Sequence, residues 1–176
     1  MIEQADRKAT IKRLLDLRAA SAQFKERYRF LPGDFPVGTE MATVPATCRT
    51  GGTGAGNGDG VIDRAAGASE STCAIEHLYQ SGLLANAQLS TKYGAISIMS
   101  RANATSYFTS VAGTAPANNV RDGIRNVIVL ENIPCSLALG IDEALDDGDL
   151  VTPSGSVASL SGACAGSTPV WLAVGL

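Results

Sequence analysis

The first thirty residues carry their larger side chains at helical spacing. Between Ile2 and Phe30 there is no proline or glycine, and alanines and long unbranched side chains dominate, which favours helix. The larger side chains recur every three or four residues, at Ile11, Leu14, Leu17, Ser21, Phe24 and Tyr28. Pro32 and Gly33 then end the segment. The pattern predicts one long amphipathic helix over residues 2–30, with one face that another part of the chain must cover.

The rest of the chain predicts shorter helices and several strands. A second helix is expected over residues 69–87, capped by Ser71 or Thr72, and a third is expected to start at Pro134. Runs of β-branched and larger apolar residues predict strands at 95–100, 107–111, 126–130 and 169–174. The first two runs are separated by a short break and predict an antiparallel hairpin, which the third extends to a meander.

These elements predict an α+β fold. A long one-sided helix and an antiparallel sheet each have one face to bury, so we expect the helix to pack on the sheet with loop-rich flanks. The length of 176 residues suits one domain or a small pair, and 45% apolar and 18% charged residues suit a globular fold. The net charge of −3 without a basic block gives nucleic-acid binding no electrostatic support. No run approaches the ~20 apolar residues of a membrane span, and no signal peptide is visible.

The four cysteines indicate two disulfides. With no C-x-x-C pair and a single histidine, the chain offers no familiar zinc pattern. An even number of widely spaced cysteines in loop-rich surroundings favours disulfides, and therefore an oxidising compartment, over four free thiols. Sequence allows three pairings. We favour Cys48–Cys73 and Cys135–Cys164, because each of them closes a short loop.

A glycine run over residues 51–60 raises three ligand-binding interpretations. A phosphate-binding loop or a dinucleotide fingerprint would need flanking strand and helix, and the phosphate loop a Lys-Ser/Thr ending, none of which is present. A calcium loop is nearer, because Asn57, Asp59 and Asp63 match ligand positions of an EF-hand. Alanine stands at the first and twelfth positions, which excludes a full EF-hand. An irregular, weak calcium site at these three residues stays open beside a plain turn.

A second acidic segment follows the third predicted helix. Its carboxylates are Asp142, Asp146, Asp147 and Asp149. The C-terminal end of a helix disfavours negative charge, so these residues are rival candidates for binding a cation. Around the single histidine, His77, no nucleophile–base pattern is visible, and we predict no catalytic residue and no enzyme. Apart from calcium, no cofactor is expected.

Three segments, in order, resemble one group of type IV pilin-like proteins. The run YRFLPGD ending at Asp34 is similar to the group's KYGxLPGD motif. The segment GNGDGVID…E…IEHLYQSGLL resembles GNGDGxI…E…WxHLxxAGLI, although Ile75 stands where an aromatic residue is common. The segment IDEALDDGDLVTPSGSV is similar to IDxKLDDGxPxTGxV, with departures at Glu143-Ala144 and near Pro153. These segments cover about half of the chain.

The resemblance implies a structural subunit of a type IV pilus or of a type II secretion pseudopilus. Residues 1–31 would be the C-terminal half of the pilin helix, and 32–176 the globular head. The first half of that helix, a membrane span, would precede Ile2, and Met1 would be an introduced start. The chain would then be extracytoplasmic, anchored in the inner membrane before assembly, with other pilin subunits as partners.

The sequence leaves a second class of function open. A secreted or periplasmic binding or adhesin module, without filament assembly, could carry the same helix packed on its own sheet. Major and minor pilins are not distinguished either, nor are roles in adhesion, motility, DNA uptake and secretion.

Overall fold

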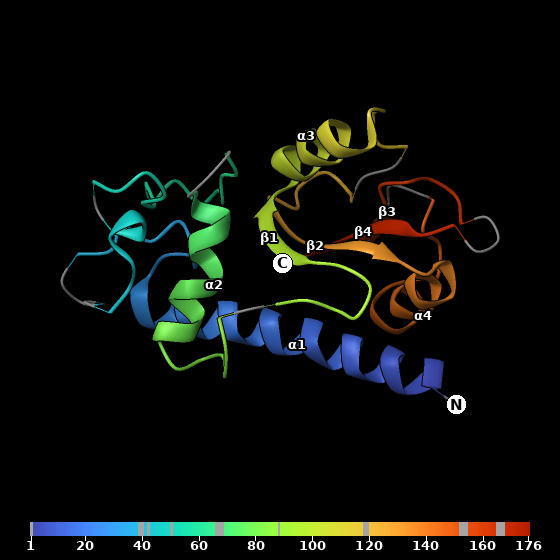
Figure 1. The fold of residues 1–176 in the computed structure, drawn as a ribbon, viewed down its shortest axis with the longest axis horizontal. Helices are drawn as coiled ribbons and strands as arrows, with labels where there is room; N and C mark the ends of the chain where they lie inside the picture. Colours follow the sequence, from blue (N-terminus) through green and yellow to red (C-terminus); the bar gives the residue numbers. More distant parts are fainter. Residues whose placement is uncertain are drawn as a thin grey trace.

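The computed structural model describes residues 2–38, 41, 43–49, 51–65, 69–87, 89–117, 120–151, 155–164 and 168–176. One long helix, α1 (Ile2–Tyr28), runs along one side of the molecule, and a four-stranded sheet lies beside it (Figure 1). The predicted α+β class with an antiparallel sheet is confirmed. Two parts of the motifs lie outside the described residues: residue 66, at the twelfth position of the EF-hand comparison, and residues 152–154, in the third segment that resembles pilin-like proteins.

Helix α1 buries the face that its spacing predicts. Of the predicted stripe, Leu14, Leu17, Ser21 and Phe24 are buried, whereas Ile11 and Tyr28 are half-buried; Ala20 is buried beside them. On the opposite face Leu15 is 47% exposed. The 27 residues of the helix extend about 40 Å. The helix ends at Tyr28, two residues earlier than predicted, because Arg29 adopts a φ of 69° and its N–H bonds the Lys25 carbonyl at 2.8 Å.

The sheet has the strand order β1–β2–β4–β3, and every pair is antiparallel. Its strands are β1 (Ile96–Ser100), β2 (Asn126–Ile133), β3 (Val157–Ser159) and β4 (Val170–Gly175). The strands predicted at 95–100, 126–130 and 169–174 are confirmed. Strand β3 was not predicted, since three residues are too few to show an alternating pattern.

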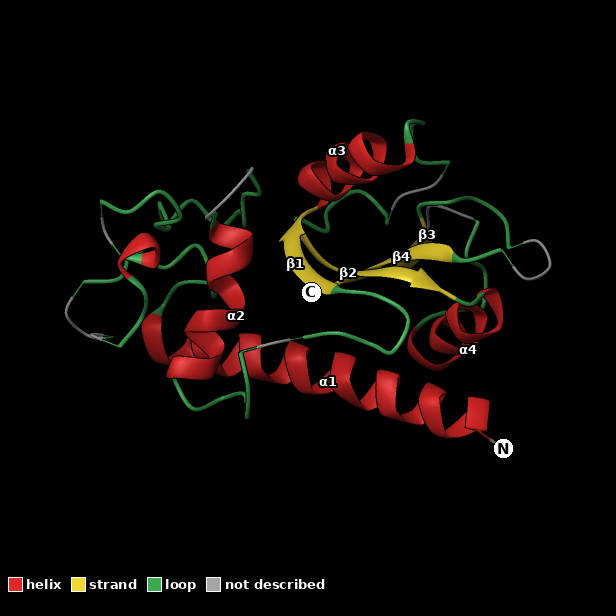
Figure 2. Ribbon diagram, in the orientation of Figure 1, coloured by secondary structure: helices red, strands yellow, loops and turns green. Residues whose placement is uncertain are grey.

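Alternate residues along the strands enter two different cores. Three further helices pack around the sheet: α2 (Glu70–Gln80), which lies beside the edge strand β1, α3 (Arg101–Ala112) and α4 (Cys135–Leu145). Ile98, Ile128 and Leu172 belong to the core shared with α1, α2 and α4. Their neighbours Met99 and Val127 belong to the core under α3. Helix α3 therefore lies on the opposite side of the sheet from α1 and α4 (Figure 2).

The strand predicted at 107–111 is wrong, because these residues lie within α3. Aromatic and β-branched side chains favoured a strand, but the ends of the segment specify a helix. Ser100 caps the first turn by accepting the Asn103 N–H at 3.2 Å, and Gly113 ends the helix with a φ of 71°. Phe108 packs on the sheet. The predicted hairpin is therefore absent, and β1 reaches its partner β2 through a helical connection.

Helix α2 is shorter than the predicted span of 69–87. Its N-cap is Ser69, so the predicted caps Ser71 and Thr72 are wrong. The Thr72 hydroxyl still closes the first turn, because it accepts the Ser69 N–H at 2.9 Å. At the other end Gly82, with a φ of 75°, turns the chain away from the helix.

Both predicted disulfides are confirmed. The Cys48–Cys73 bond joins a single 3₁₀ turn (Ala46–Cys48) to α2, with Cα atoms 5.5 Å apart. The Cys135–Cys164 bond joins the first residue of α4, which follows Pro134, to the loop beyond β3, with Cα atoms 5.4 Å apart. In the chain-entropy model each bond stabilises the fold by roughly 3 kcal/mol.

Candidate functional site

The glycine run surrounds a buried carboxylate of the chain itself. Asp34 is 1% exposed, and its Oδ1 accepts the N–H groups of Gly58 and Asp59 at 2.7 and 3.1 Å. Its Oδ2 accepts the Gly60 N–H at 2.9 Å. Gly58 and Gly60 have φ values of 79° and 84°, which turn successive N–H groups towards one centre. These N–H groups, which a phosphate could have used, bind Asp34.

A second buried carboxylate, on α2, also accepts hydrogen bonds from the glycine-rich segment. Glu70, in the first turn of that helix, accepts the N–H of Asn57 through Oε1 at 3.1 Å and that of Asp63 through Oε2 at 2.8 Å. We call Asp34, Glu70 and residues 57–63 the Asp34 cluster. Burial raises the pKa of both carboxyl groups, and the backbone donors oppose that shift. Sequence reasoning assigned no role to either carboxylate, although both stand in the motifs that carry the resemblance.

His77 completes this part of the core, where its side chain is buried. Its Nδ1 accepts the Gly33 N–H at 3.0 Å, and its ring stacks on Phe24 with centroids 5.9 Å apart. Burial lowers the pKa of His77 to about 4, with the Cys48 carbonyl opposing the shift. No hydroxyl, thiol or carboxylate among the described residues is hydrogen-bonded to it. Its role is to hold the LPGD turn against α1 and α2.

The side-chain oxygen of each of the three predicted calcium ligands accepts a hydrogen bond from the protein itself. The Asn57 Oδ1 accepts the Asp59 N–H at 2.9 Å, and the Asp59 Oδ1 accepts the Val61 N–H at 2.8 Å. The Asp63 Oδ1 accepts from the Asn103 side chain at 3.1 Å. These bonds shape the loop as a series of turns. Calcium binding at these residues stays a prediction.

The structure brings carboxylates together at the C-terminal end of α4. One oxygen from each of Asp142, Asp146 and Asp147 lies within 4.8 Å of the other two. We call these three residues the acidic turn. The fourth residue of the rival set, Asp149, donates its N–H to the Asp147 Oδ1 at 3.0 Å. Three of the four carboxylates in this rival set therefore converge.

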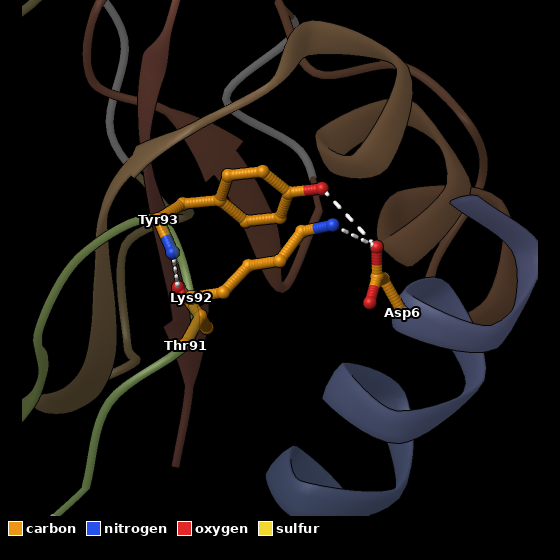
Figure 3. Close-up of polar contacts among 4 residues, drawn as sticks. All are labelled: Asp6, Thr91, Lys92 and Tyr93. Atoms are coloured by element: carbon orange, nitrogen blue, oxygen red, sulfur yellow. Dashed lines mark hydrogen bonds and ion pairs between the residues drawn. The ribbon is translucent and has the colours of Figure 1, made fainter. Parts of the chain in front are cut away.

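The N-terminal half of α1 is fastened to the loop before β1. The Asp6 carboxylate forms an ion pair with Lys92 and accepts the Tyr93 hydroxyl at 3.4 Å (Figure 3). The Thr91 hydroxyl orders this loop by accepting the Tyr93 N–H at 3.0 Å. Helix α1 therefore contacts the rest of the protein near both of its ends.

A cleft of about 570 Å³ lies beside the C-terminal half of α1. Its basic lining residues are Arg18, Lys25, Arg29 and Arg125. Gly58, Gly60 and Asp34 of the Asp34 cluster form another part of its wall. Arg18 donates its Nε–H to the Gly175 carbonyl at 2.7 Å, and burial lowers the pKa of its guanidinium group. The concentration of cations suits an acidic group.

Comparison of the chain with protein-family models, with curated proteins and with solved structures finds no match. Within the described part of the chain, no helix combines the length and the apolar character that crossing a bilayer requires. The function proposed below therefore depends on the chain's own residues and geometry.

Proposed function

We propose that this protein is a structural subunit of a type IV pilus or of a type II secretion pseudopilus. The observation that carries the proposal is the one-sided packing of α1. Its inner stripe is buried on the head, while Leu15, Ala19 and Ala22 form an exposed outer face. In a filament this face would contact the helices of neighbouring subunits, and repetition of that head-to-tail contact would extend the polymer. An apolar segment before Ile2 would anchor the subunit in the inner membrane before assembly.

The Asp34 cluster supports the same proposal. Two of the three segments that resemble pilin-like proteins meet there, around the C-terminal end of α1. Their carboxylates accept backbone N–H groups, and His77 accepts another. These motifs therefore serve to join the helix to the head, as a polymerising subunit needs, and no reacting group is required of them.

A second function is a secreted or periplasmic binding module. The basic cleft beside α1 favours it, because four cations around a hollow of about 570 Å³ could take an acidic ligand. In that case the exposed face of α1 would have no assembly role. The two functions therefore differ in what they require of Leu15.

The test is filament assembly by the full-length protein in a strain that expresses it. We expect Leu15→Glu to reduce sheared surface filaments, or cross-linked pseudopilus ladders, at least tenfold, because a charge would enter the contact between helices. The matched control is Val111→Glu, since Val111 on α3 is 58% exposed and lies on the far side of the sheet. The purified Leu15→Glu and Val111→Glu proteins should each have the same melting temperature as the wild type. Equal filament amounts in all three strains would contradict the proposal.

A further inference from the structure

The acidic turn holds a buried carboxylate that has no partner. Asp142 is 0% exposed, and neither of its oxygens has a hydrogen-bond partner among the described residues. Asp34 is buried to the same degree but accepts three N–H groups. A buried ionised carboxylate without donors or a counter-ion is strongly disfavoured. The environment of Asp142 is therefore incomplete without a proton or a cation.

Neighbouring negative charges destabilise the ionised form of Asp142 further. Asp146 and Asp147 each place an oxygen within 4.8 Å of it, and the three lie at the C-terminal, negative end of the α4 dipole. Burial, followed by these neighbouring carboxylates, raises the pKa of Asp142 to about 6. No cation among the described residues forms an ion pair with Asp142, Asp146 or Asp147. Arg18 acts on Asp146 only at a distance while bonded to the Gly175 carbonyl, and Arg7 pairs with the outlying Glu143 at 2.9 Å.

We propose that Asp142, Asp146 and Asp147 bind a divalent cation of the calcium class. The site is independent of the proposed filament function. Three carboxylates without His or Cys select a hard cation over zinc. Opposite ligands of Ca²⁺, at 2.3–2.6 Å from the ion, lie about 5 Å apart, so oxygens within 4.8 Å of one another fit one coordination sphere. Water and backbone carbonyls would supply the remaining ligands.

The contacts of Asp146 indicate the structural role that the cation would have. Its Oδ2 accepts the Val157 N–H at 2.9 Å, at the start of β3. The carboxylate lies so close to Gly155 that a Cβ there would be 2.1 Å from Oδ2. A cation shared by Asp142 and Asp146 would therefore join the end of α4 to the edge strand β3.

The experiment compares melting of the purified, disulfide-intact protein in 1 mM CaCl₂ and in EGTA. A Kd of roughly 0.1–1 mM predicts a wild-type Tm higher by about 1–5 °C in calcium. Asp147→Asn removes an exposed ligand and should lose most of this shift. Asp142→Asn should lose all of it and melt above the wild type in EGTA, because the unpaired charge is gone. The matched control, Asp59→Ala in the Asp34 cluster, should keep the full shift.

Isothermal titration with CaCl₂ gives the second readout, with one site expected in the wild type and in Asp59→Ala, and none in Asp142→Asn. Equal wild-type curves in calcium and EGTA would overturn the proposal, and would identify Asp142 as a carboxyl group kept protonated. A shift that survives Asp147→Asn but disappears in Asp59→Ala would also overturn it, and would place the ion at the glycine run. If Asp142→Asn fails to fold, Asp147→Asn decides.

Discussion

The Asp34 cluster and the acidic turn bury the same side chain in opposite surroundings. Asp34 lies among three backbone donors that two left-handed glycines direct towards it. Asp142 lies among other carboxylates at the negative end of a helix. Because Asp34 and Asp142 are both buried, burial alone does not define the role of a carboxylate. A satisfied carboxylate such as Asp34 joins loops together, whereas an unsatisfied one such as Asp142 requires a proton or a ligand.

Asp34→Asn should have the largest effect on stability. The new amide must direct an NH₂ group at one or more of the donors that now bond the carboxylate, so at least one buried N–H loses its acceptor. We expect the free energy of unfolding to fall by about 2–4 kcal/mol, measured by urea denaturation. The control is Asp16→Asn, whose carboxylate forms an exposed pair with Lys12 on α1 and should contribute under about 1 kcal/mol. Equal effects of the two substitutions would refute the structural role of Asp34.

His77 provides a second large effect, through pH. Its folded-state pKa of about 4 lies below the ordinary value of 6.5, so the unfolded chain binds the proton more tightly. This contribution is fully present above pH 6.5 and is lost as the pH falls to 4, by about 3 kcal/mol. Asp34 and Glu70 have raised pKa values and act in the opposite sense at acidic pH.

Comparison with His77→Gln separates these contributions, because the variant keeps both carboxylates and an acceptor for the Gly33 N–H. We expect the stability difference between wild type and variant to shrink or reverse in favour of the variant between pH 7 and pH 4, measured by urea denaturation at each pH. Parallel pH curves for the two proteins would show that His77 titrates normally in the folded state.

Asp142→Asn is the same chemical change as Asp34→Asn and should have the opposite sign. In EGTA the substitution removes a buried charge that has no partner, although the new amide still lacks hydrogen bonds. We expect a net stabilisation of about 1 kcal/mol by urea denaturation. A loss as large as that of Asp34→Asn would mean that the Asp142 carboxylate is satisfied after all, and would remove the contrast.

Local sequence patterns predicted the elements whose signals are long. Helix α1 has a periodic stripe from Ile11 to Tyr28, about five turns, and β2 and β4 carry several β-branched residues. At residues 107–111 the strand propensity of Tyr107 and Phe108 is outweighed by the helix caps at Ser100 and Gly113. For β3 there was no local signal to weigh, because its pairing with β4 is decided by tertiary packing.

The candidate sites were predictable only as lists of residues. The sequence named the glycine run and the aspartates after α4, but Asp34 is 24 residues from Gly58, and only the fold brings them together. Similarly, the aspartates of the acidic turn can be read from the sequence, whereas the complete burial of Asp142 depends on how α4 packs. Which carboxylate has donors and which lacks them is a tertiary property.

Asp59→Ala should have the smallest effect, although Asp59 adjoins Asp34 in space. Its side chain is exposed, and the one bond described for it is to the Val61 N–H at the surface, which water can replace. Its charge also raises the pKa of Asp34, so removing it relieves some repulsion at the buried carboxylate. The two contributions have opposite signs, and we expect a change within about 0.5 kcal/mol by urea denaturation. A loss of 2 kcal/mol or more in EGTA would show that the exposed side chain, and not the buried Asp34 with its N–H donors, holds the loop in place.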